Sequence, residues 1–456
     1  MSSSLLADGL VIEYSPRQER QSMLESRSYR FGLAVMVSPR KRRLFYGYHI
    51  VAVTFLFMLL VNGFGVYAFG LFVKPLEESL GWRRGQVMVG FTVFYALMAI
   101  ASPIVGRFLD RYGARAVIPF GAVLMCLGFL LLSTTNSIHT FYAGYAIVGA
   151  GAATMGPVPC SAVISNWFKR RRGTALGLMS AGYGAGGVVM APLVGQLLSN
   201  FDWRTTYLSI ALLIVGVTVP LSLAAIRSRP EEMGLLPDGD SAPTGDASDE
   251  AHGGDKVLGL TLRQSLSTAS FWLVAATFFF SSFAHMGTIQ SLAPFLEDTG
   301  YPTAMAASAL GAIGLGSGAG KIFFGWLCDR IRANRACAIG IALQLAAVLL
   351  LLKVHPGSSI IFVATCAIVL GFGMGAWLPT LSMLTSTIFG LPFYGAVFGA
   401  LYLCQGIGAA GGPLFSGLVH DVTASYSGVF ASYLVLLAMA IPTVLFLRKP
   451  SLSARS

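Results

Sequence analysis

Twelve long apolar stretches, separated by short polar or charged turns, make up most of this chain. Each stretch is long enough to cross about 30 Å of hydrocarbon as a helix. Glycine and other small residues lie within these stretches, where they allow transmembrane helices to approach one another closely. The pattern therefore predicts an all-α membrane protein with spans near residues 47–72, 86–106, 116–135, 139–166, 174–199, 205–226, 269–296, 303–328, 336–354, 358–388, 393–419 and 426–447.

The composition agrees with this prediction. The chain is 55% hydrophobic and 11% charged, and a soluble globular protein carries roughly twice that charged fraction. None of the six cysteines belongs to a Cys-x-x-Cys pair, which favours packing over a disulfide framework or a metal site. The sequence also contains no metal-ligand cluster and no nucleophile–base set. We therefore expect no cofactor, no metal and no enzymatic activity.

A polar segment divides the spans into two sets of six. Residues 227–268 are rich in Pro, Gly, Asp, Ser and Thr without periodicity, which predicts a cytoplasmic linker. On its two sides we expect an amino-terminal six-helix bundle over residues 47–226 and a carboxy-terminal one over residues 269–447. Residues 1–46 and 448–456 are then cytoplasmic tails, the first of them disordered.

The two halves carry the same landmarks at nearly the same separation, which indicates an internal duplication. Two pseudo-symmetric six-helix repeats, related by an axis along the membrane normal, are typical of transporters. Such proteins bind their substrate near the membrane midplane, between the repeats. The landmark pairs are Gly106 and Gly325 (219 residues apart), Pro192 and Pro413 (221 residues) and Asp202 and Asp421 (219 residues).

The net charge of +11 follows the expected membrane topology. With residue 1 in the cytoplasm, 25 of the 31 lysines and arginines lie in segments on that side and 5 on the other. The positive-inside rule then places both termini in the cytoplasm. Because topology accounts for the basic charge, we expect no nucleic-acid partner. The predicted location is the cell membrane, with the lipid bilayer around a multi-pass chain.

The remaining cation, Lys321, lies inside the eighth predicted span. A lysine there costs a few kcal/mol unless it is compensated, and no carboxylate lies deep in any predicted span. An anionic substrate is the natural counter-charge, and Ser317 shares the same helix face. The alternative is that Lys321 snorkels to the cytoplasmic interface. Asp329, however, is eight residues away, roughly 12 Å along a helix, and a lysine side chain reaches about half that distance.

Other polar and aromatic side chains within the spans are candidates for the same site. His285, in the seventh span, is a candidate substrate contact or proton carrier, and a structural hydrogen bond is the alternative. For the remaining candidates the alternative is packing or helix-to-helix hydrogen bonding. They are Asn62, Tyr67, Tyr95, Tyr142, Tyr145, Trp377, Tyr402 and Gln405.

The turn after the second span carries a ten-residue motif with a partial copy in the second half. It reads Gly106-x-x-x-Asp110-Arg111-x-Gly113-x-Arg115, and the copy reads Gly325-x-x-x-Asp329-Arg330. This motif resembles the loop 2–3 signature of the major facilitator superfamily, and the resemblance covers residues 45–448. It implies twelve helices in two six-helix bundles and transport by alternating access.

The same resemblance implies roles for particular residues. The motif residues would form a cytoplasmic gate, with Asp110 facing the N-terminus of a neighbouring helix and the arginines pairing across the loop. The alternative is that these charges are solvated and only set the topology. Since spans 1 and 11 line the cavity in such proteins, Tyr67, Tyr402 and Gln405 are the preferred cavity residues.

Four further segments resemble the bacterial monocarboxylate and oxalate–formate branch of this family. In that branch a cation four residues before the motif glycine of span 8 pairs with the substrate carboxylate. Lys321 matches this position, where arginine is usual, and Ser317 stands where animal members have a proton-coupling aspartate. The segments that carry the resemblance are residues 46–49, 79–82, 166–177 and 229–239.

These observations predict a secondary transporter that moves a small organic anion, a mono- or dicarboxylate. Anion exchange requires no proton carrier in the protein, whereas symport with protons would use His285, Lys321 or the substrate itself. The alternative function is the export of bulkier amphipathic or drug-like compounds. In that case Lys321 would be dispensable and aromatic residues would dominate the site.

Overall fold

The computed structural model describes residues 45–239, 259–301, 303–423 and 425–447. The predictions for the tails, residues 1–46 and 448–456, therefore lie almost entirely outside the described residues. From Tyr46 onward the chain forms one unit. Every regular element in its described part is a helix.

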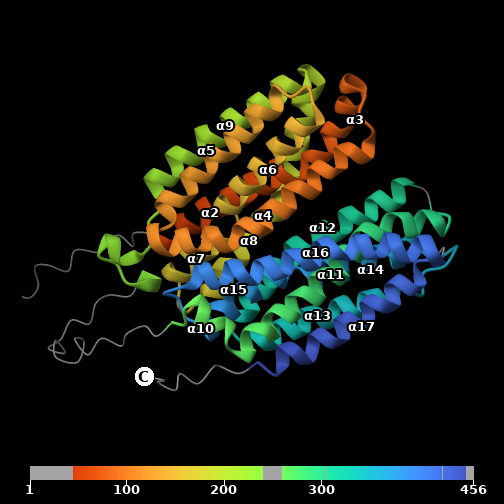
Figure 1. The fold of residues 1–456 in the computed structure, drawn as a ribbon. Coiled ribbons are helices and arrows are strands. Elements are labelled where there is room, and N and C mark those ends of the chain that lie inside the picture. Colours follow the sequence, from red (N-terminus) through yellow and green to blue (C-terminus); the bar gives the residue numbers. More distant parts are fainter. Residues whose placement is uncertain (1–44, 240–258, 302, 424, 448–456) are drawn as a thin grey trace, which may run out of the picture. The chain divides into compact units, whose positions relative to one another are not determined.

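Twelve helical spans of the described chain are long and apolar enough to cross a membrane, which confirms the predicted number of spans. Figure 1 shows the six spans before the linker grouped together, and the six after it likewise. The first group consists of α2 (Gly47–Asn62), η1 (Gly63–Tyr67), α3 (Phe69–Leu80), α4 (Arg84–Tyr112), α5 (Ala114–Ser133), α6 (Ile138–Met155), α7 (Pro157–Trp167), α8 (Arg172–Asn200) and α9 (Trp203–Ala225).

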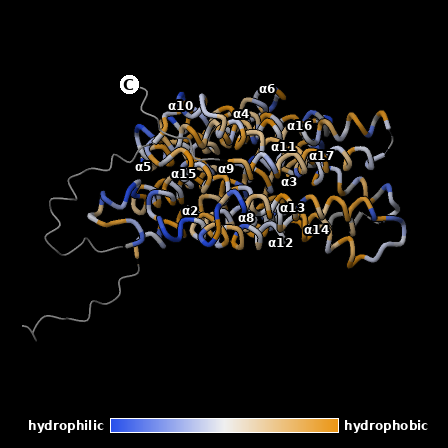
Figure 2. Tube along the Cα trace, turned by 90° about the horizontal axis from the view of Figure 1, so that it is seen from below, coloured by the Kyte–Doolittle hydropathy of each residue, from blue (hydrophilic) through white to orange (hydrophobic). Residues whose placement is uncertain are grey.

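The second group repeats this plan. Apolar residues predominate along the helices of both groups, and hydrophilic residues gather mostly at the helix ends (Figure 2). The helices of the second group are α11 (Ala269–Asp298), α12 (Thr303–Cys328), α13 (Ala333–Leu351), α14 (Ile360–Met374), α15 (Trp377–Ile388), α16 (Tyr394–Thr423) and α17 (Ser427–Leu445).

Spans 4 and 10 are each broken into two helices at equivalent points. In span 4 the chain leaves helical geometry at Gly156 (φ −85°, ψ −142°), and α7 begins at Pro157. A proline lacks an N–H donor and is best tolerated at the first position of a helix, which accounts for the break at this point. Span 10 changes from α14 to α15 across Gly375 and Ala376. The internal repeat is therefore visible in the irregularities of the helices as well as in their number.

The linker carries short helices at both ends. The first end holds η2 (Pro230–Met233) and η3 (Pro237–Gly239), and the second holds α10 (Leu262–Leu266). The first end, residues 226–239, lies along the amino-terminal group, and we call it the strap. Trp167 donates from its indole nitrogen to the carbonyl of Arg227 at 2.8 Å, and Asn166 donates to the carbonyl of Ser228 at 3.1 Å. The strap is thus fastened to the end of α7.

Candidate substrate site and gate

Lys321 is buried in α12 and points away from the motif. Its side chain is 4% exposed, and its ammonium donates to the Ser317 hydroxyl at 2.5 Å. Ser317 lies one turn closer to the helix N-terminus, the direction in which helical side chains lean. The ammonium therefore extends away from Asp329 and not toward the interface that snorkelling requires. Of the Lys, Arg, Asp and Glu side chains that the structure describes, Lys321 is the only buried one.

One aromatic ring lies beside this ammonium, and two further rings from other helices continue from it. Lys321 Nζ is 5.8 Å from the ring centroid of Tyr183 in α8, within the range of a cation–π contact. The Trp377 ring of α15 lies 6.1 Å from that of Tyr183 and 6.1 Å from that of Tyr402 in α16. Tyr402 is buried, whereas Tyr183 and Trp377 are partly exposed. Helices of both halves thus meet around Lys321.

Two residues of the first span belong to the same neighbourhood. Asn62 is buried at the end of α2, where its amide donates to the carbonyl of Met58 at 2.9 Å and its side chain also interacts with Tyr183. Tyr67 ends η1 and interacts electrostatically with Tyr183. Gly187 of α8 makes room for it, because a Cβ there would lie 2.9 Å from the tyrosine ring. We call Lys321, Ser317, Tyr183, Trp377, Tyr402, Asn62 and Tyr67 the central cluster.

His285 and Gln405 are buried next to this cluster. His285 of α11 is 3% exposed and interacts electrostatically with Lys321. Its Nδ1 has no partner of standard hydrogen-bond geometry in the described part of the chain, although the Ser281 carbonyl lies one turn earlier on the helix. Gln405 is 5% exposed and follows Tyr402 by three residues on α16, so the two share a helix face.

The structure does not bring Tyr145 into this group. Its hydroxyl is hydrogen-bonded to that of Tyr207 at 3.0 Å, and its ring packs edge-on against Phe69 and Phe141. These partners all come from the amino-terminal half. For Tyr145 the structure therefore favours the alternative reading from the sequence, in which the side chain packs and hydrogen-bonds between helices.

One tyrosine of the site, Tyr183, was absent from the sequence-based set. Tyr183 is the central aromatic contact of Lys321, and Tyr95 of α4 interacts electrostatically with both Tyr183 and Tyr67. A signal for Tyr183 existed, since it is the single large residue in the run Gly182-Tyr-Gly-Ala-Gly-Gly187. Small neighbours leave an aromatic side chain accessible. Tyr95 was itself a candidate from the sequence, whereas Tyr142, another candidate, donates its hydroxyl to the carbonyl of Gln86 at 2.9 Å.

Asp110 joins the two halves. It does so at the end of the helix bundle where the two motif turns lie, which we call the motif end. One carboxylate oxygen accepts from the N–H of Gly395 and the other from that of Ala396, each at 2.8 Å. Both donors belong to the first turn of α16, whose N–H groups have no partner within the helix. A carboxylate is favoured there by charge as well as by hydrogen bonding. This contact links α4 to a helix 285 residues further along the chain.

Asp329 makes the equivalent contact with the roles of the halves exchanged: the carboxylate comes from the second half and the donors come from the first. It accepts from the N–H groups of Gly173 at 2.6 Å and Thr174 at 2.7 Å, and from the Thr174 hydroxyl at 2.6 Å. These donors begin α8. We call the Asp110 and Asp329 contacts the two clamps.

The halves are closest at the motif end and separate beyond it. A Cβ on Gly177 of α8 would lie 2.6 Å from the carbonyl oxygen of Lys321 and 2.9 Å from the Cα of Gly325. Further along the same pair of helices, a Cβ on Gly184 would have Gly318 as its nearest neighbour, at 3.9 Å. Glycine at positions 177 and 325 is thus required by the close approach of the two backbones.

A hydrogen bond between equivalent residues lies in the same region. The Ser382 hydroxyl of α15 donates to that of Ser161 in α7 at 3.1 Å, and the two are 221 residues apart. This separation matches the offset of the repeat, so the bond lies at the pseudo-two-fold axis. Together with the clamps it joins the two halves at the motif end.

The side chains of the motif arginines contact aromatic rings or a backbone carbonyl and not the motif aspartates. Arg111 lies over the Tyr112 ring, Arg330 lies over the Trp326 ring, and Arg115 donates to the carbonyl of Leu223 at 3.2 Å. Ion pairs across the loop were expected, and the described residues show none between these arginines and Asp110 or Asp329. Both aspartates accept from backbone N–H groups of the other half instead. Gly113 ends α4 at φ +75°, a conformation that favours glycine.

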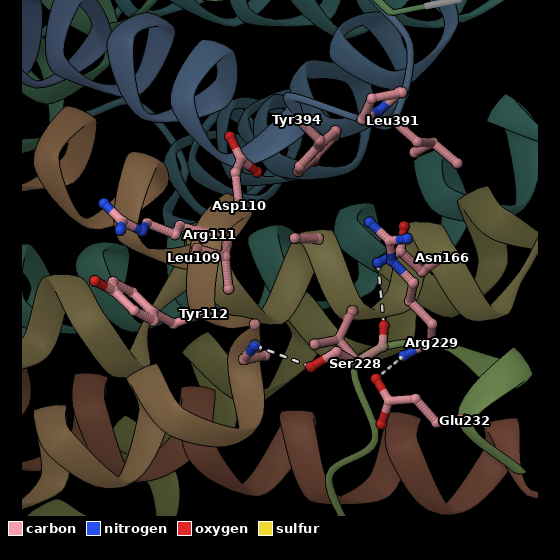
Figure 3. Close-up of a pocket in the computed structure, with 15 residues that line it drawn as sticks. Leu109, Asp110, Arg111, Tyr112, Asn166, Ser228, Arg229, Glu232, Leu391 and Tyr394 are labelled. Atoms are coloured by element: carbon pink, nitrogen blue, oxygen red, sulfur yellow. Dashed lines mark hydrogen bonds between the residues drawn. The ribbon is translucent and has the colours of Figure 1, made fainter. Parts of the chain in front are cut away.

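A cavity of about 340 Å³ lies between the motif turn and the strap (Figure 3). Its lining includes Asp110, Arg111, Asn166, Arg229 and Tyr394. Ser228 of the strap accepts from the N–H of Ala114 at 3.0 Å, and Arg229 acts electrostatically on Asp110. The cavity thus lies at the motif turn and not at the central cluster, and the cation that acts on Asp110 comes from the strap.

Asp238 fastens the far end of the strap, which gives a test of its contribution to stability. Its carboxylate accepts from the N–H groups of Arg170 at 2.7 Å and Lys169 at 3.1 Å, at a left-handed backbone position of φ +61°. We expect Asp238→Val to destabilise the protein by roughly 2–4 kcal/mol, from two lost hydrogen bonds and a strained β-branched residue. Asp238→Asn tolerates the backbone and keeps an acceptor, so its melting temperature should stay near that of the wild type. Equal melting temperatures for the two variants would contradict this role.

These features are those of a multi-pass membrane transporter: two six-span repeats, a polar and aromatic cluster contributed by both, and clamps that join the two halves at one end. The family model of the Major Facilitator Superfamily matches residues 55–413 and 315–456. The chain belongs to the major facilitator superfamily.

The individual relatives share only a low sequence identity with this chain. The chain is 22% identical over 393 residues to the oxalate:formate antiporter of Oxalobacter formigenes, covering 85% of this chain and 87% of that protein. It is 28% identical over 397 residues to monocarboxylate transporter 13 of Rattus norvegicus, covering 84% and 85%. The crystal structure of the E. coli fucose:proton symporter matches with a TM-score of 0.65 at 16% identity, over 89% of this chain and all of that one. The last likeness concerns the fold alone.

Proposed function

We propose that this protein is a secondary active transporter of a small organic anion, a mono- or dicarboxylate, in the cell membrane. The observation that carries the proposal is the burial of the Lys321 ammonium against Ser317 and Tyr183 without a buried carboxylate among the described residues. A buried cation without a counter-ion is costly. A substrate carboxylate supplies that counter-ion. The names of the relatives from Oxalobacter formigenes and rat agree with this chemistry.

The gate supports alternating access as the mechanism. The clamps and the Ser161–Ser382 bond are all contacts between the halves at the motif end. Rocking of one half against the other breaks these contacts as a set and opens the central cluster to that side. Because the positive-inside rule places the motif turns in the cytoplasm, this conformation is closed toward the cytoplasm, and both termini are cytoplasmic.

Exchange and proton-coupled symport make different demands on the cluster. In exchange, one anion replaces another at Lys321 and no proton needs to move. In symport, a proton travels with the substrate, and His285 is the ionisable side chain placed beside Lys321. Counterflow with and without a pH gradient separates these two modes of coupling.

A thermal-shift screen of the purified full-length protein tests the proposal. The ligands are acetate, lactate, benzoate, oxalate and succinate, with acetamide and benzamide as uncharged controls of matched shape. We expect at least one acid to raise the melting temperature and its amide to have no effect. A ligand at 100 times its Kd stabilises the folded state by about 2.7 kcal/mol. The stabilising acid is then tested for counterflow in proteoliposomes.

The result against the proposal is equally specific. If no acid shifts the melting temperature but amphipathic cations or neutral aromatic compounds do, the central cluster serves bulkier cargo and the protein is an exporter of such compounds.

A further inference from the structure

The charge of the central cluster matches a single carboxylate. Lys321 carries three N–H donors, one of which is directed at Ser317, so the others remain for the two oxygens of one carboxylate. Lys321 is the only buried lysine or arginine among the described residues, and the buried His285 interacts electrostatically with Lys321 itself. A second carboxylate on the ligand would therefore lose its water without gaining a cation.

Aromatic rings continue from the Lys321 ammonium toward α15 and α16. Tyr183 is the ring beside the ammonium, and Trp377 connects it to Tyr402. The Tyr183 and Trp377 rings are nearly perpendicular, at 85°, and those of Trp377 and Tyr402 are tilted by 41°. Partial exposure of Tyr183 and Trp377 leaves ring surface that is not covered by protein atoms.

These rings favour a flat ligand for a geometric reason. Aromatic pairs prefer offset-stacked or edge-to-face arrangements with centroids about 4.5–7 Å apart. Rings set at different angles offer both a face and an edge to an aromatic ligand. A saturated ring of the same size presents hydrogens on both faces and satisfies neither arrangement as well. A short aliphatic acid covers little of the ring surface.

We infer that the preferred substrate is an aromatic monocarboxylate, with its carboxylate on Lys321 and its ring against Tyr183 and Trp377. This inference rests on the proposed transport of organic anions and narrows it. Lys321 recognises the acid, whereas Trp377 and Tyr183 determine which acid is preferred. Dicarboxylates and short aliphatic acids are the poorer ligands.

The test compares four acids on the purified full-length protein by titration calorimetry: benzoate, cyclohexanecarboxylate, acetate and phthalate. We expect benzoate to bind at least tenfold more tightly than acetate and phthalate, and at least threefold more tightly than cyclohexanecarboxylate. In Trp377→Leu the benzoate-to-acetate ratio should fall below threefold, while the Kd for acetate stays within threefold of the wild type. Trp272→Leu is the matched control, since Trp272 is 58% exposed at the start of α11 and should leave the ratio unchanged.

The outcomes separate this inference from the proposed function. Phthalate or cyclohexanecarboxylate binding as tightly as benzoate would overturn the inference and leave organic-anion transport standing. So would a benzoate-to-acetate ratio that Trp377→Leu does not reduce. If none of the four acids binds, the inference and the proposed function both fail.

Discussion

Replacing Lys321 with methionine should weaken carboxylate binding by between about 30-fold and about 4,000-fold. Removing one partner of a buried, hydrogen-bonded charge pair costs about 2–5 kcal/mol, and each 1.4 kcal/mol is a factor of about ten in Kd. Methionine has nearly the length of the lysine side chain. The loss of affinity therefore results from removal of the ammonium group and not from an empty space left in the protein. Lys321→Arg should retain binding within about tenfold, because a guanidinium also pairs with a carboxylate. Titration calorimetry with the acid identified in the screen measures all three proteins.

The melting temperature without ligand distinguishes a binding lysine from a structural one. A buried ammonium without a counter-ion is costly, and Lys321 is 4% exposed. We therefore expect the melting temperature of Lys321→Met to equal or exceed that of the wild type. A marked decrease, with carboxylate binding unchanged, would make Lys321 a structural partner of Ser317 and would contradict the proposed function. Lys353→Met, at an exposed lysine after α13, is the control for loss of one positive charge.

Replacing Asp329 with alanine should shift the equilibrium toward the conformation open at the motif end by about 100-fold. The carboxylate accepts three hydrogen bonds from Gly173 and Thr174. Hydrogen bonds to a charged group contribute about 1.5–3 kcal/mol each. In the open state, water replaces the carboxylate as the partner of these donors, so we take the net loss as about 3 kcal/mol. At 1.4 kcal/mol for each factor of ten, this loss corresponds to a shift of about 100-fold. Asp110→Ala should shift the equilibrium in the same direction, since it removes the equivalent clamp.

Labelling of Cys328 with a maleimide measures this shift. Cys328 is 5% exposed and adjoins Gly173 at the crossing of α8 and α12, so opening of the motif end exposes it. In a protein that keeps Cys328 as its only cysteine, we expect Asp329→Ala to raise the labelling rate at least about tenfold. The control is Asp298→Ala at the opposite end, where Asp298 pairs with His420 at 3.6 Å. An unchanged rate in Asp329→Ala, or an equal rise in the control, would contradict the role of the clamp.

The sequence determined the elements of this fold. Twelve spans, the break before Pro157 and the repeat offset of about 220 residues are local patterns or spacings along the chain. A helix must satisfy its own backbone hydrogen bonds within the bilayer, so length and hydropathy suffice to locate each span. Lys321 was also identifiable from the sequence, because a charge within an apolar span stands out against its neighbours.

Only the tertiary structure decided which side chains meet. The sequence grouped Tyr145 with the site, whereas the fold pairs it with Tyr207; Tyr183, which the fold places beside Lys321, was missing from the prediction. The motif marked Asp110 and Asp329, but their donors in α16 and α8 are fixed by the packing of one half on the other. The physical reason is that lipid and protein interior are both apolar. The sequence of a span therefore does not show which face of the helix is turned inward, and only the packing of the helices does.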